Sequence, residues 1–240
     1  MSIPFSDTSG NLGGVQQVRS LMRVDATQYP TWKIVNSFNN YLDTVAGFMI
    51  GADKRFQWDD TNHSKLPEGT TDFVINQSDY SFLTDEQGNS IITLTGLSRL
   101  VSTGVYEPLK LVDKNEPDYY AKTFGVNTGT PTQYDKIADN IVRLDFKALA
   151  TITGGLKFFF QRTPSYFVAT DTTKSPGVSP LLHRGFVIAA AYDGALTLGL
   201  KNLQPLSVEM QKEEAKMIKY FNGRNMDEKR RMVPAYEDNH

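Results

Sequence analysis

The stretch that decides the fold reads NIVRLDF at residues 140–146 and GLKFFFQRTP at residues 155–164. In both segments apolar residues occupy every second position, which is the pattern of an antiparallel strand with one face in water. These apolar positions are Val142, Leu144 and Phe146 in the first segment and Leu156, Phe158 and Phe160 in the second. Phe159 adds an aromatic side chain to the opposite face, so we expect a helix or a neighbouring subunit to cover that face.

The strand pattern extends on both sides of this stretch. TDEQGN at residues 84–89 predicts a hairpin loop before the strand SIITL. VYEPLKLVD at residues 105–113 continues the extended pattern, and Pro108 suits an edge strand better than a central one. Residues 67–178 are therefore predicted to form an antiparallel β-sheet or sandwich domain.

Helical spacing appears on either side of this β-domain. Before it, apolar residues recur at steps of three and four after Pro30. Proline is favoured at the first position of a helix, so a helix is expected to begin there. After it, SPLLHRGFVIAAAYDGA at residues 179–195 opens a helix of small residues, in which Gly185 and Gly194 permit close approach. A last helix is expected from Pro205 to Gly223, with Glu209–Lys212 and Glu213–Lys216 as exposed pairs.

The order of helices, strands and helices predicts an α+β fold. We expect helices from both termini to form one bundle into which the β-domain is inserted. The predicted boundaries are a flexible N-terminal arm at 1–14, N-terminal helices at 15–66, the β-domain at 67–178, C-terminal helices at 179–223 and a flexible tail at 224–240.

Size and composition describe an ordinary globular chain. Its 240 residues carry 25 basic and 27 acidic side chains, a formal net charge of −2, so no global field favours nucleic acid or an anionic membrane. The chain contains no cysteine, which excludes disulfides and thiolate chemistry. We expect no signal peptide, because the N-terminus lacks a basic region and an apolar run, and no membrane span.

No residue pattern predicts catalysis, a cofactor or a metal ion. The three histidines, His63, His183 and His240, lack ligand spacing, and we expect His183 to cap or pack at a helix start. The aspartates fall in turns or on polar strand faces, where this residue is common. A serine-nucleophile elbow, a P-loop and a dinucleotide fingerprint are absent from the sequence. We therefore expect a protein that is not an enzyme.

Basic residues concentrate only near the C-terminus, between Lys212 and Arg231. They are interleaved with acidic residues, which is typical of a solvated helix face running into a disordered tail. A nucleic-acid site usually has a denser patch or aromatic side chains. We favour a tail that becomes ordered on a protein partner, with apolar anchors between its charges. These anchors are Met232, Val233, Pro234 and Tyr236.

The ordered motifs resemble those of the head-to-tail adaptor proteins of tailed bacteriophages, which form connector or neck rings beneath the portal. The resemblance covers residues 13–225. Its motifs are GGVQQVRSLMRVDATQYPTWKIVNSFNNYLD, YEPLKLVD, GTPTQYD, NIVRLDF, LKFFFQRTP and PLLHRGFVIAAAYDGA. One departure is that DFKALATITGG stands where such proteins often have a proline-rich segment.

The resemblance implies a homo-oligomeric ring, expected to be a dodecamer, in the virion neck between capsid and tail. Such a subunit is made in the host cytoplasm, docks on the portal protein, extends the channel for passing genomic DNA without sequence recognition, and carries a tail or stopper protein. It is not expected to contact a membrane. The portal-binding residues would be Arg224, Lys229, Arg230, Arg231, Met232, Val233 and Tyr236. Phe159, Gly185 and Gly194 would lie at subunit interfaces.

Two alternatives stay open. The chain could be another neck or tail ring component, such as a stopper or a tail-terminator-like protein. It could also be a β-sandwich carbohydrate-binding module, supported by aromatic residues in the expected loops. These aromatic residues are Trp58, Tyr106, Tyr119 and Tyr120.

Overall fold

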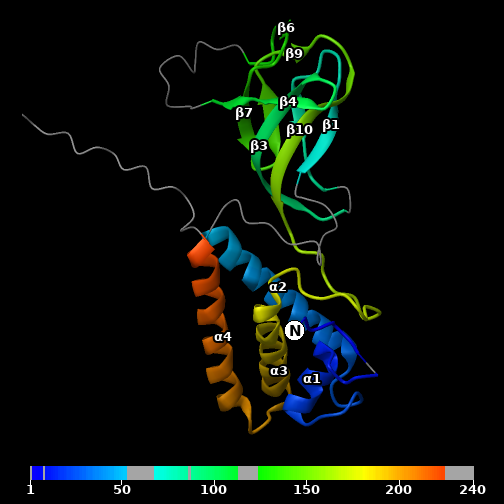
Figure 1. Cartoon of the computed structure of the whole chain (residues 1–240), viewed down its shortest axis with the longest axis vertical. Coiled ribbons are helices and arrows are strands. Elements are labelled where there is room, and N and C mark those ends of the chain that lie inside the picture. Colours follow the sequence, from blue (N-terminus) through cyan, green and yellow to red (C-terminus); the bar gives the residue numbers. More distant parts are fainter. Residues whose placement is uncertain (1, 8, 53–67, 86–87, 113–123, 225–240) are drawn as a thin grey trace, which may run out of the picture.

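The computed structural model describes residues 2–7, 9–52, 68–85, 88–112 and 124–224. Helices gather at one end of the molecule and strands at the other (Figure 1). The predicted α+β class is confirmed.

The helical part contains α1 (Gly14–Met22), α2 (Thr31–Ala52), α3 (His183–Leu198) and α4 (Leu203–Arg224). A single turn of 3₁₀ helix, η2 (Pro180–Leu182), leads into α3. α3 has no polar stripe and is buried along most of its length, which is what a central helix requires. One apolar core joins side chains of all four helices, including Val18, Leu42, Phe186 and Met217. The segments on either side of the β-domain therefore pack together.

The β-domain contains two four-stranded sheets. The first has the order β1 (Glu68–Phe73), β10 (Ile152–Arg162), β3 (Ile91–Ser102) and β4 (Val105–Pro108), all antiparallel. The second has the order β2 (Asp79–Ser81), β8 (Ile141–Leu144), β7 (Gln133–Ala138) and β5 (Lys110–Leu111), of which only β5 pairs in parallel. A small parallel pair joins β6 (Thr128–Gly129) to β9 (Lys147–Ala148).

The two sheets share one apolar core, as the alternating residues predict. Val142, Leu144 and Leu156 have no exposed surface. The rings of Phe82 and Phe158, one from each side of this core, lie 4.4 Å apart between centroids. Thr84 and Ser90 form an antiparallel bridge at the two ends of the expected hairpin loop.

One continuous segment of the chain, β4 followed by β5, connects the two sheets. β4 pairs with β3 in the first sheet, and β5 pairs with β7 in the second. The residue between these strands, Leu109, is buried and donates its backbone N–H to the Leu97 carbonyl at 2.9 Å. The chain therefore passes from the first sheet to the second at Leu109.

The prediction of a flexible arm at residues 1–14 is wrong for the described residues of that range. Phe5 is fully buried in the helical core. Its backbone N–H donates to the Lys174 carbonyl at 2.7 Å, and its carbonyl accepts from the N–H of Val15 at 2.9 Å. The composition of this stretch is Gly-, Ser- and Asn-rich, but one buried aromatic ring is enough to anchor it.

Candidate interaction surfaces

Gly185 belongs to a helix contact inside the chain. An added Cβ at this position would collide with the Met217 methyl group of α4 and would lie 3.4 Å from the Tyr41 hydroxyl of α2. Burial of the Tyr41 hydroxyl is the main cause that raises its pKa, and the negative charges of Glu214 and Glu213 raise it further. The predicted close approach is present, but it is made to helices of the same subunit.

Gly194 has the same role at the other end of α3. An added Cβ would lie 2.5 Å from the Met22 methyl group and 2.8 Å from the Tyr29 ring. Because Gly185 and Gly194 are both buried within the chain, their placement at a subunit interface is corrected. Small residues permit close packing, but the sequence does not reveal whether the partner helix belongs to the same subunit.

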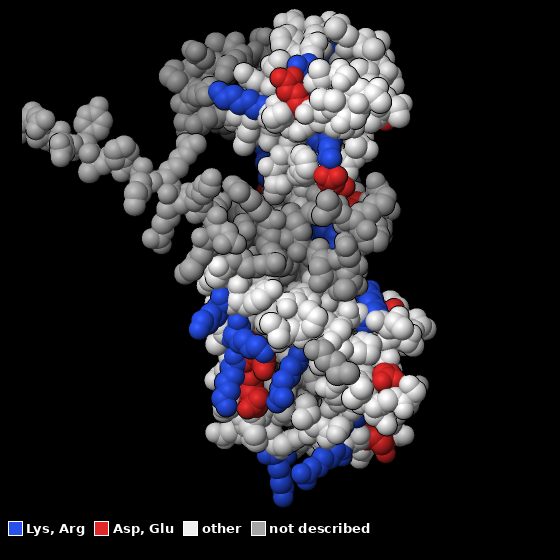
Figure 2. Space-filling model, viewed as in Figure 1, with Lys and Arg blue, Asp and Glu red and all other residues white. Residues whose placement is uncertain are grey.

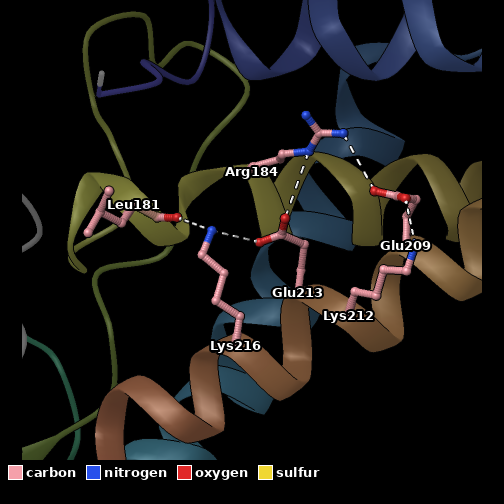
Figure 3. A network of polar contacts seen from close by, with 6 residues as sticks. All are labelled: Leu181, Arg184, Glu209, Lys212, Glu213 and Lys216. Atoms are coloured by element: carbon pink, nitrogen blue, oxygen red, sulfur yellow. Dashed lines mark hydrogen bonds and ion pairs between the residues drawn. The ribbon is translucent and has the colours of Figure 1, made fainter. Parts of the chain in front are cut away.

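A ladder of charged residues joins α3 to α4 on the molecular surface (Figure 3). The Arg184 guanidinium lies 3.6 Å from Glu209 and 3.8 Å from Glu213. The two predicted pairs, Glu209–Lys212 and Glu213–Lys216, are formed at 3.3 and 3.2 Å. Lys216 also donates to the Leu181 carbonyl at 2.7 Å.

This ladder combines three basic side chains, Arg184, Lys212 and Lys216, with two acidic ones, Glu209 and Glu213. Figure 2 shows basic and acidic side chains interleaved on this part of the bundle. Exposed ion pairs of this kind contribute little to stability, roughly 0–1 kcal/mol each. Their arrangement suits a solvated helix face, as the sequence predicted, and does not form the dense basic patch of a nucleic-acid site.

Phe159 lies half-buried on the outer face of the first sheet. The Lys157 ammonium is 5.5 Å from the centroid of its ring and 5.6 Å from that of Tyr106. Glu68 on the neighbouring strand pairs with Lys157 at 3.0 Å. Phe159 thus belongs to a mixed aromatic and charged surface, and its role in a subunit interface stays a prediction.

A groove of about 440 Å³ opens between β1 and the segment that contains β2. Its lining includes four residues with hydroxyl groups, Thr70, Thr71, Ser81 and Thr84. It also includes three phenylalanines that belong to the buried core, Phe82, Phe158 and Phe160. β1 and β2 are the edge strands of the two sheets, so the groove lies where the domain is open.

Aliphatic side chains are exposed on two neighbouring loops of the β-domain. Ile75 and Leu149 are 52% and 62% exposed. The two loops are held together by hydrogen bonds from the Asn76 N–H to the Ala148 carbonyl at 3.0 Å and from the Ile75 N–H to the Thr151 hydroxyl at 3.2 Å. β9, which contains Ala148, lies at the end of the domain away from the helices (Figure 1). We call Val74, Ile75, Leu149 and Ile152, all at least 41% exposed, the distal patch.

Most residues of the predicted portal-binding segment lie outside the described residues. Arg224 is the last residue of α4, one position beyond the expected helix end. The others are Lys229, Arg230, Arg231, Met232, Val233 and Tyr236, and the aromatic residues Trp58, Tyr119 and Tyr120 are also outside the described ranges.

His183 packs at the start of α3, as expected. It is 2% exposed, and its ring accepts from the Ile3 N–H at 3.0 Å and contacts the Val178 carbonyl at 2.9 Å. Within residues 2–7, 9–52, 68–85, 88–112 and 124–224, no group of three or more metal-ligating side chains is found. No helix in these same ranges is long and apolar enough to cross a membrane.

Comparison with known proteins found no match for this chain among family models or among curated proteins.

Proposed function

We propose that this protein is a structural subunit of the neck of a tailed bacteriophage, an adaptor that forms a ring beneath the portal and carries the tail. The observation that carries the proposal is the separation of two different surfaces in one subunit. The distal patch lies at the far end of the β-domain, whereas the charged ladder belongs to the helical part, and α4 ends where the helical part faces the β-domain (Figure 1). An adaptor needs two separate surfaces, because it binds two different partners.

The distal patch is proposed as the contact for the tail or stopper protein. Exposed apolar side chains that gather on neighbouring loops can mark a protein interface. Phe159 and the surface around Lys157 are proposed to face the neighbouring subunit of a ring, in which heterologous contacts repeat around a closed axis. The ring is proposed to have twelve copies, to match a portal.

The segment after Arg224 is proposed as the contact for the portal. Its sequence places Arg230 and Arg231 next to Met232 and Val233, so charged and apolar anchors are adjacent. Such a segment can be ordered by its partner and can prevent free subunits from assembling early.

The test mixes the purified protein with the portal of the same virus and images the product by negative-stain electron microscopy. An added ring beneath the portal is expected. A chain that ends at Arg224 should give a bare portal, whereas the double variant Ile75→Asp, Leu149→Asp should still add the ring but fail to recruit the tail protein. A bare portal with the full chain would contradict the adaptor role.

The groove between β1 and β2 supports a second candidate, a carbohydrate-binding module. The groove is lined by residues whose hydroxyl groups can bond to a sugar, namely Thr70, Thr71, Ser81 and Thr84. Binding of the full chain to a glycan array, lost in the Thr70→Val variant, would favour this function over the adaptor.

A further inference from the structure

The first residues of the chain bind residues 163–179, which connect β10 of the β-domain to η2 and α3 of the helical part. We call residues 163–179 the returning segment. The N–H groups of Phe5 and Ser6 donate to the carbonyls of Lys174 and Thr172 at 2.7 and 3.1 Å. The Phe5 ring is enclosed by Phe38 and Phe167, at centroid distances of 5.4 and 4.9 Å. These first residues therefore hold the returning segment against the bundle.

The same residues also cap α1. Gly13 at the helix start offers no capping side chain. The carbonyl oxygens of Pro4 and Phe5 instead accept the first N–H groups of the helix, those of Gly14 and Val15, at 2.8 and 2.9 Å. Unsatisfied N–H groups at a helix start are costly when they are buried. Loss of residues 3–6 from their site would thus leave α1 uncapped.

His183 fixes the beginning of this arm, and its hydrogen bonds define its protonation state. A backbone N–H can only donate, so the Nδ1 atom that accepts from Ile3 at 3.0 Å carries no proton. In a neutral imidazole the proton is then on Nε2, which donates to the Val178 carbonyl at 2.9 Å. The ring is 2% exposed, so water cannot readily replace either partner. His183 joins the arm, the returning segment and α3 only as a neutral ring.

A protonated ring cannot make both contacts. An imidazolium carries N–H groups on both nitrogens and has no acceptor. Its Nδ1–H would point at the Ile3 N–H, and two donors would face each other in a buried site. Leaving a buried donor unsatisfied is unfavourable. Proton uptake therefore opposes the contact with Ile3 and favours displacement of the arm.

Charged groups on the elements around His183 are engaged with other partners. On α3, Arg184 pairs with Glu209 and Glu213 of α4. Lys216 of α4 binds Glu213 and the Leu181 carbonyl. On the returning segment, Lys174 pairs with Asp171 at 3.8 Å and donates to the Tyr166 carbonyl at 2.6 Å. On the arm, Asp7 accepts from Ser9 and Gly10. The carboxylates of these pairs are thus bound by cations or N–H groups.

We infer that residues 3–6 form an acid-sensitive latch, in which neutral His183 holds the N-terminal arm over the aromatic pair Phe38 and Phe167. The latched state excludes one proton that the released state accepts. The latch is therefore closed at neutral and higher pH and is lost as the pH falls. A free imidazole takes up its proton near about pH 6.5, and below that value the ratio of latched to released arm falls about tenfold for each pH unit. This inference does not depend on the proposed function.

The first test uses nuclear magnetic resonance of the full chain with ¹⁵N-labelled histidine. At pH 7.5 the Nδ1 resonance of His183 should be that of an unprotonated ring nitrogen, and Nε2 should carry the proton. The second test follows hydrogen exchange of the Ile3 amide, corrected for the intrinsic pH dependence of exchange. Protection should fall by about fivefold between pH 6.5 and 5.5.

The His183→Asn variant separates the latch from general acid effects. The Asn side chain places an oxygen acceptor at the position of Nδ1 and does not titrate, so protection of Ile3 should no longer depend on pH. The double variant His63→Asn, His240→Asn is the matched control and should keep the pH dependence of the wild type. Protection that is equal at both pH values in the wild type, or a proton on Nδ1 at pH 7.5, would overturn the inference even if His183→Asn did not fold.

Discussion

The ring of Phe5 stacks on the ring of Phe167, with centroids 4.9 Å apart and planes inclined by 24°. One residue lies at the start of the chain and the other lies just after the last strand of the β-domain. Their contact makes the N-terminal arm part of the helical core.

Replacing Phe5 by Ala should therefore destabilise the protein strongly. Removal of a fully buried phenylalanine costs about 3–5 kcal/mol, because both apolar burial and packing contacts are lost. Urea denaturation would measure the change in the free energy of unfolding. Leu12→Ala is the matched control, because Leu12 is 49% exposed and its loss should cost less than about 0.5 kcal/mol. Equal effects of the two variants would contradict the buried arm.

Gly194→Ala should also be destabilising, by about 1–3 kcal/mol, because the new methyl group meets Met22 and the Tyr29 ring. Gly47→Ala provides the comparison within α2. An added Cβ at Gly47 has nothing within 4 Å, so it should raise stability by about 0.5–1 kcal/mol through the helix propensity of alanine. Thermal unfolding of both variants would show shifts of opposite sign, and two shifts of the same sign would be incompatible with the packing of α3.

The buried ion pair of the β-domain should be sensitive to loss of one partner. Arg162 and Asp85 lie 3.6 Å apart, and each side chain is 2% exposed. Burial lowers the pKa of Arg162 to about 10, and Asp85 opposes that shift. Asp85→Asn would remove the negative charge of this pair from beside the buried guanidinium, at a cost of roughly 3–5 kcal/mol.

An exposed pair in the same domain is the control for this variant. Arg143 and Asp79 are 2.8 Å apart but 44% and 47% exposed, so Asp79→Asn should cost less than about 1 kcal/mol. Chemical denaturation of the two asparagine variants side by side would check the difference. A larger decrease in the free energy of unfolding for Asp79→Asn than for Asp85→Asn would contradict the expected effect of burial on the Arg162–Asp85 pair.

Stability should fall above pH 10, in part through Tyr166. Burial, followed by the hydrogen bond to Asp43, raises the pKa of Tyr166 to about 12. The native state then holds this proton more tightly than the unfolded state, whose tyrosines titrate near about 10. The contribution is fully present below pH 10 and is lost as the pH rises toward 12.

The Tyr166→Phe variant tests this alkaline effect. Its free energy of unfolding should decline less between pH 9 and pH 11 than that of the wild type. Ultraviolet absorbance of tyrosinate gives an independent measurement, and a native Tyr166 that ionised near pH 10 would refute the expected shift.

Much of the fold could be predicted from local patterns. The alternation at residues 140–146 and 155–164 is confirmed, because Leu144, Leu156 and Phe160 face the shared core. The helices before and after the β-domain were also expected, since their apolar spacing and Pro30 act over one or two turns. Local patterns succeed here because each reports on the burial of its own segment.

Contacts between distant segments could not be predicted in this way. The role of Phe5 depends on Phe38 and Phe167, and the role of Gly185 depends on Met217. Nothing in the spacing of a single residue identifies such partners. For the same reason the groove between β1 and β2 and the distal patch were not anticipated, because both are formed by strands and loops brought together only by the sheet order.

The insertion of the β-domain between α2 and α3 bears on how the chain folds. α2 ends at Ala52, and its helical partner α3 begins at His183. During synthesis the apolar side of α2 stays uncovered until the whole β-domain and then α3 have emerged. Closing so long a loop has an entropic cost, which is reduced once the β-domain has folded and brought its own ends together. A defect confined to the sheets would therefore slow assembly of the helices and leave newly made α2 open to aggregation.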